Sequence, residues 1–251
     1  MDFTLENYSK LLDLLTKQEV LFSTLRRYFT SGVEGEPFAI LRHDVDYNAE
    51  NALVFAVLEA RMGIQATYFF RAPHCRRSFN IGIIKEIESL GHEVGYHYET
   101  LDSCRGNFEA AVRLFDSEVE EFRESGFNIS TVCPHGNPRV KKRNYRTNGD
   151  ILSYDLDLLI RNGLIGDAYN SVDFDSFVYI SDVGVRFRGI GIVKDLKQLL
   201  EREKFARMYF LIHPDYWSKS GYRAFLLWLA GKTMRKLRCN IIVSNLREVV
   251  R

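Results

Sequence analysis

Short apolar blocks and amphipathic stretches follow one another along most of the chain. The blocks are rich in β-branched and aromatic residues and have the length of strands. Between them, apolar positions recur at helical spacing, and several such stretches end at a glycine, as at Gly63, Gly91 and Gly126. Alternating strands and helices predict an α/β fold built on a parallel sheet. The predicted strands cover residues 38–41, 66–70, 93–97, 129–133, 177–181, 208–212 and 240–243.

The amino-terminal part of the chain has a helical pattern of its own. Its apolar positions predict two short helices that end near Gly32. We therefore expect a short helical extension over residues 1–34 and a barrel-like domain over residues 35–251. Residues 140–175 have the least regular pattern and predict a long insert with a functional role. The helices predicted in the domain cover about residues 48–62, 80–90, 107–125, 194–203 and 219–237.

Length and composition narrow the class of protein. A chain of 251 residues suits one large domain that buries a core without disulfides or metal staples. The 34 basic and 33 acidic residues balance, so nothing predicts binding to nucleic acid or an anionic membrane. No apolar run reaches the ~18–20 residues of a membrane span, and Met1–Asn7 lacks the features of a signal peptide. The four cysteines form no CxxC pair. These features predict a cytoplasmic protein with free thiols, and they leave its oligomeric state unknown.

Ionisable residues collect where predicted strands end. The carboxyl ends of parallel strands share one edge, which is where such folds build their sites. A single histidine there is more often a hydrogen-bonded structural residue, and Asp46 could simply cap a helix. Four strand-end histidines together with Asp44 and Asp46 instead favour a metal site. Side chains alternate along a strand, so Asp44 and Asp46 are expected to point the same way, one to bind metal and one to accept a proton. The four histidines are His43, His97, His135 and His213.

Four motifs carry a family resemblance, and they occur in the family's order. They are Leu41-Arg42-His43-Asp44-Val45-Asp46, Gly91-His92-Glu93-Val94-Gly95-Tyr96-His97, Cys133-Pro134-His135-Gly136 and Leu211-Ile212-His213-Pro214-Asp215. From about residue 38 to 245, the sequence resembles the polysaccharide deacetylase family, also called NodB-homology or carbohydrate esterase family 4. The resemblance implies a distorted (β/α) barrel with fewer than eight strands.

The resemblance also implies residue roles. By the motif match, Asp44 is the catalytic base and His213 the general acid, while Asp46 and His97 bind a divalent metal, with zinc the expected ion. A backbone N–H at the His135 turn is expected to help hold the oxyanion. His92 has no ligand role in this match.

One family ligand is missing. The family has a second ligand histidine four residues after the first, and this chain has Leu101 there. Two replacements remain open, His135 and Glu99. We favour His135, because imidazole suits the expected metal and its strand end faces the same cleft.

Several further residues are candidates for substrate-binding or supporting roles. Asp182 and Arg186 are expected to form a charge pair that orients Asp44. Arg71 and Arg139 are candidates for holding a substrate carboxylate or phosphate, or are surface charges. Asn137, which follows the His135 turn, and Glu99 complete this set.

These observations predict a metal-dependent hydrolase that removes an N-acyl group, in the first place N-acetyl, from a sugar. The cytoplasmic setting favours a small carbohydrate or a nucleotide- or lipid-linked sugar, as a precursor of a cell-surface glycan. Two alternatives stay open. The same residues could cut another C–N bond, such as a formamide or cyclic imide. The missing ligand at Leu101 is also consistent with a catalytically silent carbohydrate-binding relative.

Overall fold

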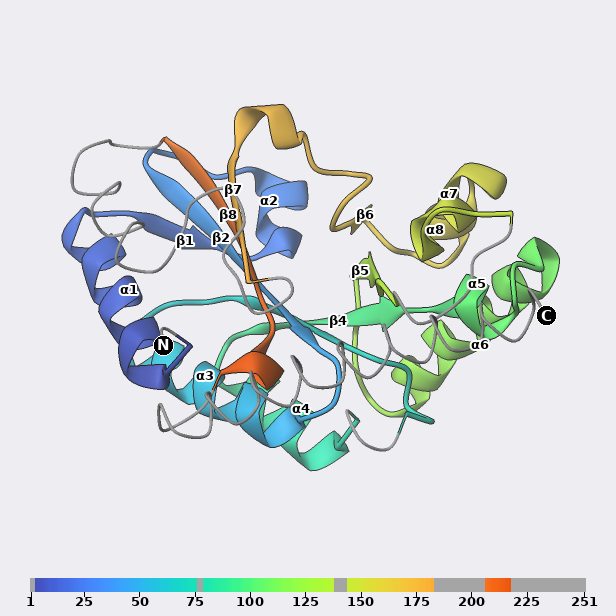
Figure 1. Cartoon of the computed structure of the whole chain (residues 1–251), viewed down its shortest axis with the longest axis horizontal. Coiled ribbons are helices and arrows are strands. Elements are labelled where there is room, and N and C mark those ends of the chain that lie inside the picture. Colours follow the sequence, from blue (N-terminus) through green and yellow to red (C-terminus); the bar gives the residue numbers. More distant parts are fainter. Residues whose placement is uncertain (1–2, 76–78, 138–143, 183–205, 218–251) are drawn as a thin grey trace, which may run out of the picture.

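The described part of the chain is built around one parallel sheet. The computed structural model describes residues 3–75, 79–137, 144–182 and 206–217. Seven strands lie in the order β6-β5-β4-β3-β2-β8-β7, and the short strand β1 pairs with the first half of β2. The curled sheet is flanked by helices (Figure 1), and the predicted distorted (β/α) barrel with fewer than eight strands on its path is confirmed. The strands are β1 Leu21–Ser23, β2 Phe38–Val45, β3 Thr67–Phe70, β4 Glu93–Tyr98, β5 Thr131–Pro134, β6 Gly166–Asp167, β7 Val178–Ser181 and β8 Arg207–Ile212.

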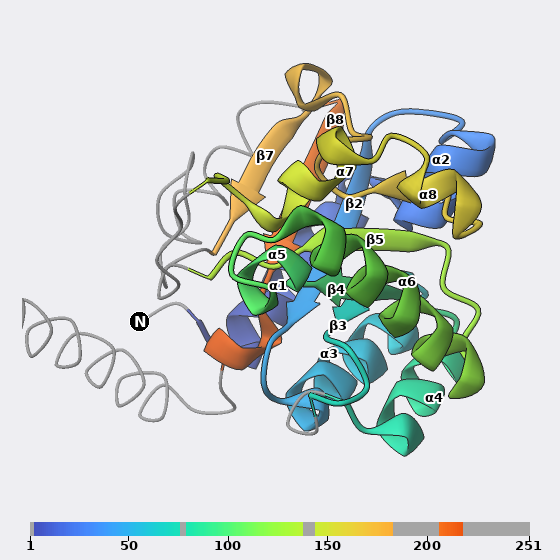
Figure 2. The same cartoon turned by 90° about the vertical axis from the view of Figure 1, so that its right-hand side faces the viewer.

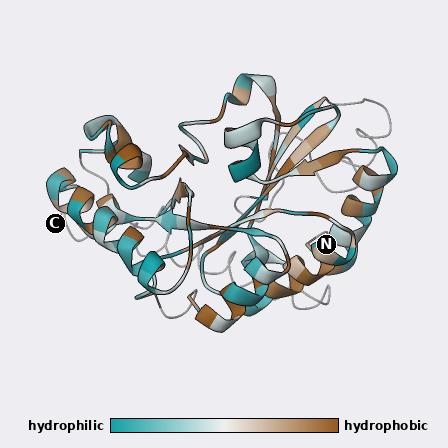
Figure 3. Ribbon diagram, turned by 180° about the vertical axis from the view of Figure 1, so that it is seen from behind, coloured by the Kyte–Doolittle hydropathy of each residue, from teal (hydrophilic) through white to brown (hydrophobic). Residues whose placement is uncertain are grey.

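Helices cover the outside of this sheet. Asn48, Asn80 and Asn107 begin three of them, because each side chain accepts a backbone N–H of the first turn. Helices α3 and α4 lie side by side in two perpendicular views (Figures 1 and 2). The helices carry both hydrophobic and hydrophilic bands (Figure 3), as expected when one face packs on a core. They are α1 Leu5–Lys17, α2 Leu25–Ser31, α3 Ala49–Arg61, α4 Ile81–Ser89, α5 Thr100–Ser103, α6 Phe108–Glu124, α7 Ile151–Tyr154 and α8 Leu158–Arg161, with short 3-10 turns η1 Asn148–Asp150, η2 Phe174–Ser176 and η3 Pro214–Tyr216.

The sequence pattern predicted most of these elements, and the exceptions have local reasons. Residues 21–23, expected in a helix, form β1, because their backbone pairs with β2. The first predicted strand continues to Val45 rather than ending at residue 41. Strand β6 lies within the insert predicted over 140–175. The helices predicted over 194–203 and 219–237 and the strand predicted over 240–243 lie outside the described residues. The boundary between residues 34 and 35 stays a prediction.

Strand β2 separates two cores by the alternation of its side chains. Ala39 and Leu41 pack in the core shared with the outer helices. Phe38 and Ile40 point the other way and pack with residues of neighbouring strands inside the barrel. Arg42 and Asp44 continue this inner row toward the carboxyl end of the strand. Along β2, the row of inward side chains is therefore apolar at the start of the strand and ionic at its carboxyl end.

Gly95 in β4 leaves room inside the barrel for its neighbours. A Cβ at this position would lie 2.5 Å from the ring of Phe69 on β3 and 3.0 Å from the Thr131 carbonyl oxygen on β5. Neither neighbour can give way easily, because both are buried. The glycine two residues before His97 is thus required by close packing beneath the strand ends.

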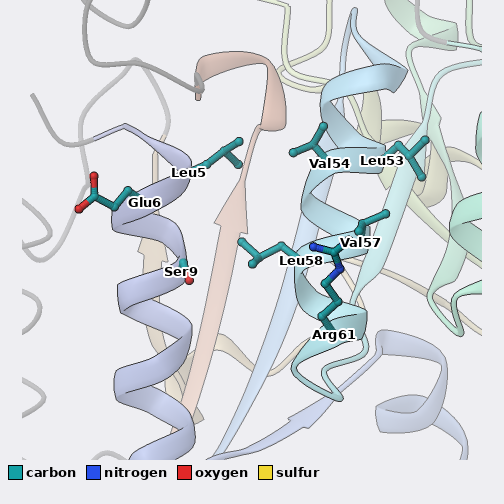
Figure 4. Close-up of a pocket in the computed structure, with 8 residues that line it drawn as sticks. All are labelled: Leu5, Glu6, Ser9, Leu53, Val54, Val57, Leu58 and Arg61. Atoms are coloured by element: carbon teal, nitrogen blue, oxygen red, sulfur yellow. The ribbon is translucent and has the colours of Figure 1, made fainter.

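An apolar groove of about 530 Å³ lies on the outer surface between α1 and α3. Figure 4 shows Leu5 on α1 opposite Val54 and Leu58 on α3. None of its lining residues is one of the ionisable strand-end residues. Among the described residues, no helix is both long and apolar enough to cross a membrane.

Candidate active site

Asp44 is held as an anion by a neighbour on its own strand. Arg42 lies two residues earlier on β2, so both side chains point into the barrel. Its Nε and Nη2 atoms donate to the two Asp44 carboxylate oxygens at 2.8 and 2.7 Å. Burial favours the neutral acid, but the Arg42 guanidinium and the His97 ring outweigh it and hold the pKa of Asp44 well below its ordinary value. Asp44 is therefore ionised at neutral pH, as a proton acceptor must be.

Asp46, His97 and His135 meet beyond the ends of three strands. The Nε2 atoms of His97 and His135 each lie 3.5 Å from Asp46 Oδ1. All three side chains are buried, and their candidate ligand atoms lie within 4.8 Å of one another. Asp46 Oδ1 is itself buried and has no partner with hydrogen-bond geometry among the described residues. Such an oxygen is normally satisfied, so this arrangement fits a bound cation.

Hydrogen bonds at Nδ1 orient His97 and His135 so that the Nε2 atom of each ring faces Asp46. Nδ1 of His97 lies 3.1 Å from the Cys133 carbonyl oxygen, and Nδ1 of His135 lies 2.9 Å from a Glu99 carboxylate oxygen. A carbonyl or carboxylate only accepts, so each Nδ1 carries the hydrogen and leaves a lone pair on Nε2. Burial lowers the pKa of both rings, against the opposing effect of Asp44 on His97 and of Asp46 on His135. Neutral imidazole with a free Nε2 is the form that binds metal.

His213 has the opposite electrostatic environment. It follows β8, and its Nδ1 donates to Asp182 Oδ1 at 2.7 Å while its backbone N–H donates to Asp182 Oδ2 at 2.8 Å. Trp217 Nε1 donates to the same carboxylate at 2.9 Å. Burial favours the neutral ring, but Asp182 outweighs it and, with smaller effects of Asp44 and Asp46, raises the pKa of His213 to about 9. His213 is thus protonated at neutral pH and able to act as an acid.

Among the described supporting residues, Asp182 and Arg71 pair with groups other than those expected. Asp182 bonds His213 and not Asp44, whose partner is Arg42. Arg71 forms an ion pair with Glu99 Oε1 rather than standing free for an anionic substrate. Asn137 lies two residues after His135. Arg139 and Arg186 lie outside the described residues.

The expectation that four strand-end histidines converge is wrong for His43. Its neighbour Asp44 points into the barrel, so alternation sends His43 to the outer core. There its Nε2 lies 2.7 Å from Glu59 on α3, and it stacks on the ring of Tyr68. Three strand-end histidines therefore remain at the site.

The other two histidines also lie away from the site. His92 precedes β4 and bonds the Ala56 carbonyl oxygen, consistent with its expected lack of a ligand role. His74 lies 3.6 Å from Glu118 on α6.

The backbone N–H of His135, expected to help hold the oxyanion, is engaged in another hydrogen bond. It donates to the Tyr98 carbonyl oxygen at 2.7 Å, so it is not free to hold an oxyanion. At the next residue, Gly136, an added Cβ would meet no atom of the described residues within 4 Å.

Leu101 lies away from the candidate metal site, because its helix places it in the outer core. It lies in α5 directly after β4, is fully buried, and belongs to the outer core. Glu99 has both carboxylate oxygens engaged, one by Arg71 and the other by His135. Among the described residues, the group that contains Asp46 as a possible ligand contains His135 and does not contain Glu99.

Two residues of the site were missed by reasoning from the sequence. Arg42 had a usable signal, since it stands two positions before Asp44 in a strand and must share its face. Asn148 had none, because it lies in the irregular insert. Its Nδ2 donates to the His135 carbonyl oxygen at 2.7 Å and to Asp102 at 3.0 Å.

Comparisons with known proteins find similarity in structure only. No protein-family model and no curated protein matches the sequence. A pseudoenzyme of carbohydrate esterase family 4 from Bacillus anthracis is 14% identical with a TM-score of 0.44; the match covers 78% of this chain and 60% of that one. A family 4 carbohydrate esterase from the same organism is 15% identical with a TM-score of 0.42, covering 90% and 84% of the two chains.

A third similar structure is the catalytic domain of peptidoglycan N-acetylglucosamine deacetylase from Eubacterium rectale. It is 17% identical with a TM-score of 0.45, and the match covers 80% of this chain and 86% of that one. At these identities the likeness concerns the fold alone, and the role of each residue rests on the contacts within this chain.

Proposed function

We propose that the protein is a metal-dependent hydrolase that removes an N-acyl group, in the first place N-acetyl, from a sugar or a sugar-linked precursor. The single observation that most supports this proposal is that histidines at the carboxyl-end edge of the sheet are kept in different protonation states. His97 and His135 are kept neutral with Nε2 free beside Asp46, whereas His213 is kept protonated by Asp182. Environments that separate pKa values in this way typically separate ligands and bases from acids.

A divalent cation fits the donor set. One carboxylate oxygen and two imidazole nitrogens are ligands typical of catalytic zinc sites, which keep another position open. Asp46, His97 and His135 would hold the ion. When bound, it would supply Lewis-acid chemistry by polarising the acyl carbonyl and making a water molecule more acidic.

The chain's own residues account for the proton transfers of amide hydrolysis. Asp44, ionised by its pair with Arg42, would take a proton from the attacking water. As the C–N bond breaks, protonated His213 would give its proton to the departing amine nitrogen. The products are a carboxylic acid and the free amine, so one water molecule is consumed and no other reactant is needed.

The experiment that tests this proposal is a product assay with three outcomes. The purified protein is loaded with zinc and given N-acetyl and N-formyl amino sugars, free and nucleotide-linked, and acetate, formate and free amine are measured. Metal-dependent acetate release supports the proposal. Formate release without acetate indicates hydrolysis of a different C–N bond. Sugar binding without product in either case indicates a silent relative. A cytoplasmic setting and the linked form of the sugar stay predictions.

Replacing Asp182 by Asn should move the alkaline limb of the pH–rate profile. The acid His213 is active while protonated, so turnover should fall as pH rises through about 9. Asp182 is the main group that raises the pKa of His213 against the effect of burial. Without its charge this pKa should fall, and the alkaline limb should move to lower pH by about 1–3 units. The profile of kcat measures this, and the low-pH arm serves as the internal control. If the alkaline limb is unchanged in a folded Asp182→Asn protein, His213 is not the general acid.

A further inference from the structure

Arg71, Glu99 and His135 form a row in which the first two side chains support the third. Arg71 follows β3, Glu99 follows β4 and His135 follows β5, and these three strands are neighbours in the sheet. The guanidinium of Arg71 pairs with Glu99 Oε1, and Glu99 Oε2 accepts from His135 Nδ1 at 2.9 Å. The row therefore ends with His135 Nε2 pointing at Asp46, 3.5 Å away.

The backbone of His135 is fixed independently of this row. Its N–H donates to the Tyr98 carbonyl oxygen, and its carbonyl accepts from Asn148 Nδ2, each at 2.7 Å. What these contacts leave undetermined is the rotation of the imidazole ring and the nitrogen that carries its hydrogen. Glu99 makes the ring contact that decides both.

From this geometry, and resting on the proposed metal site, we propose that Glu99 is a positioning residue that makes His135 a metal ligand, with Arg71 holding Glu99 in place. A carboxylate on the remote nitrogen orients the ring, fixes the tautomer and strengthens the imidazole as a ligand. His135 needs such support, because it stands at the end of a strand rather than on a helix. Glu99 acts through His135 and does not itself bind the ion.

The test is the zinc dissociation constant, measured by competition with a chromophoric chelator. Glu99→Ala should weaken zinc binding by about 10–100-fold. Glu99→Gln should weaken it less, because its amide oxygen still accepts from Nδ1 while the Arg71 ion pair is lost. Glu121→Ala, a change of the same kind on α6 beside His74, is the matched control and should bind zinc normally.

A double-mutant cycle separates positioning from ligation. In a His135→Ala background, Glu99→Ala should cause no further loss, since its effect passes through the missing ring. The visible spectrum of the cobalt-loaded protein should change in Glu99→Ala, and the melting temperature of the metal-free protein should not.

Each other outcome identifies what has failed. If the unchanged protein binds zinc and Glu99→Ala binds it equally well, the positioning role is overturned while the proposed metal site stands. If Glu99→Ala weakens binding further in the His135→Ala background, Glu99 is a ligand and the inference is wrong. If the unchanged protein binds no divalent metal, the proposed function fails, and the inference fails with it.

Discussion

Replacing Asp44 by Asn should lower kcat by about 10²–10⁴-fold, the contribution typical of a positioned general base. Asn has nearly the same shape, and its carbonyl oxygen can still accept one hydrogen bond from Arg42. What it loses is the negative charge that the Arg42 pair maintains, and with it the ability to take a proton. Zinc affinity should stay close to that of the unchanged protein, because Asp46 and the two imidazoles provide the ligand atoms.

The matched control for this change is Glu93→Gln. Glu93 is also a buried carboxylate on the inner face, but it lies at the opposite end of the barrel and accepts from Thr67 and Thr131. Burial raises its pKa, so the neutral form is tolerated there. Initial-rate kinetics on both variants compare the two acids. Equal kcat values for Asp44→Asn and the unchanged enzyme would show that another group accepts the proton.

Replacing His135 by Ala should abolish tight zinc binding and turnover together. The site would keep only Asp46 and His97, and two protein ligands hold zinc weakly compared with the three of typical catalytic sites. The loss should exceed the about 10–100-fold effect of a residue that only orients a ligand. Metal content after dialysis, together with titration of the metal-free protein, measures the effect.

His92→Gln controls for the loss of a buried imidazole. His92 is buried like His135 but precedes β4, at the far end of the sheet, where it bonds the Ala56 carbonyl oxygen. Its variant should be less stable yet bind about one zinc ion per chain. If the His135→Ala protein still binds zinc normally, His135 is not a ligand. The proposal that it takes the place of the ligand missing at Leu101 would then be wrong.

The two variants together distinguish a catalytic failure from a binding failure. Asp44→Asn is expected to keep the metal and lose turnover, whereas His135→Ala is expected to lose both. This split follows from the geometry. Arg42 engages both oxygens of Asp44, whereas Asp46 Oδ1 has no hydrogen-bond partner among the described residues and lies beside His97 and His135.

The order of elements and the orientation of nearby side chains were determined by the sequence itself. Strand blocks, helical spacing and helix-starting asparagines are local signals, and local backbone preferences act before distant contacts exist. Alternation along one strand also put Asp44 and Asp46 on the same face. The same rule places Arg42 with them and His43 on the other side, because the strand continues past residue 41 to Val45.

Only the tertiary structure decided which strand ends become neighbours and which side chain meets which. Glu99 and His135 both follow strands, and no sequence pattern says that β4 lies between β3 and β5. That order brings Arg71, Glu99 and His135 into one row and leaves His135, not Glu99, facing Asp46. The pairing of Asp182 with His213 likewise depends on β7 lying beside β8. Such contacts join residues far apart in the chain, and they are set by the packing of the whole sheet, which no short stretch of sequence encodes.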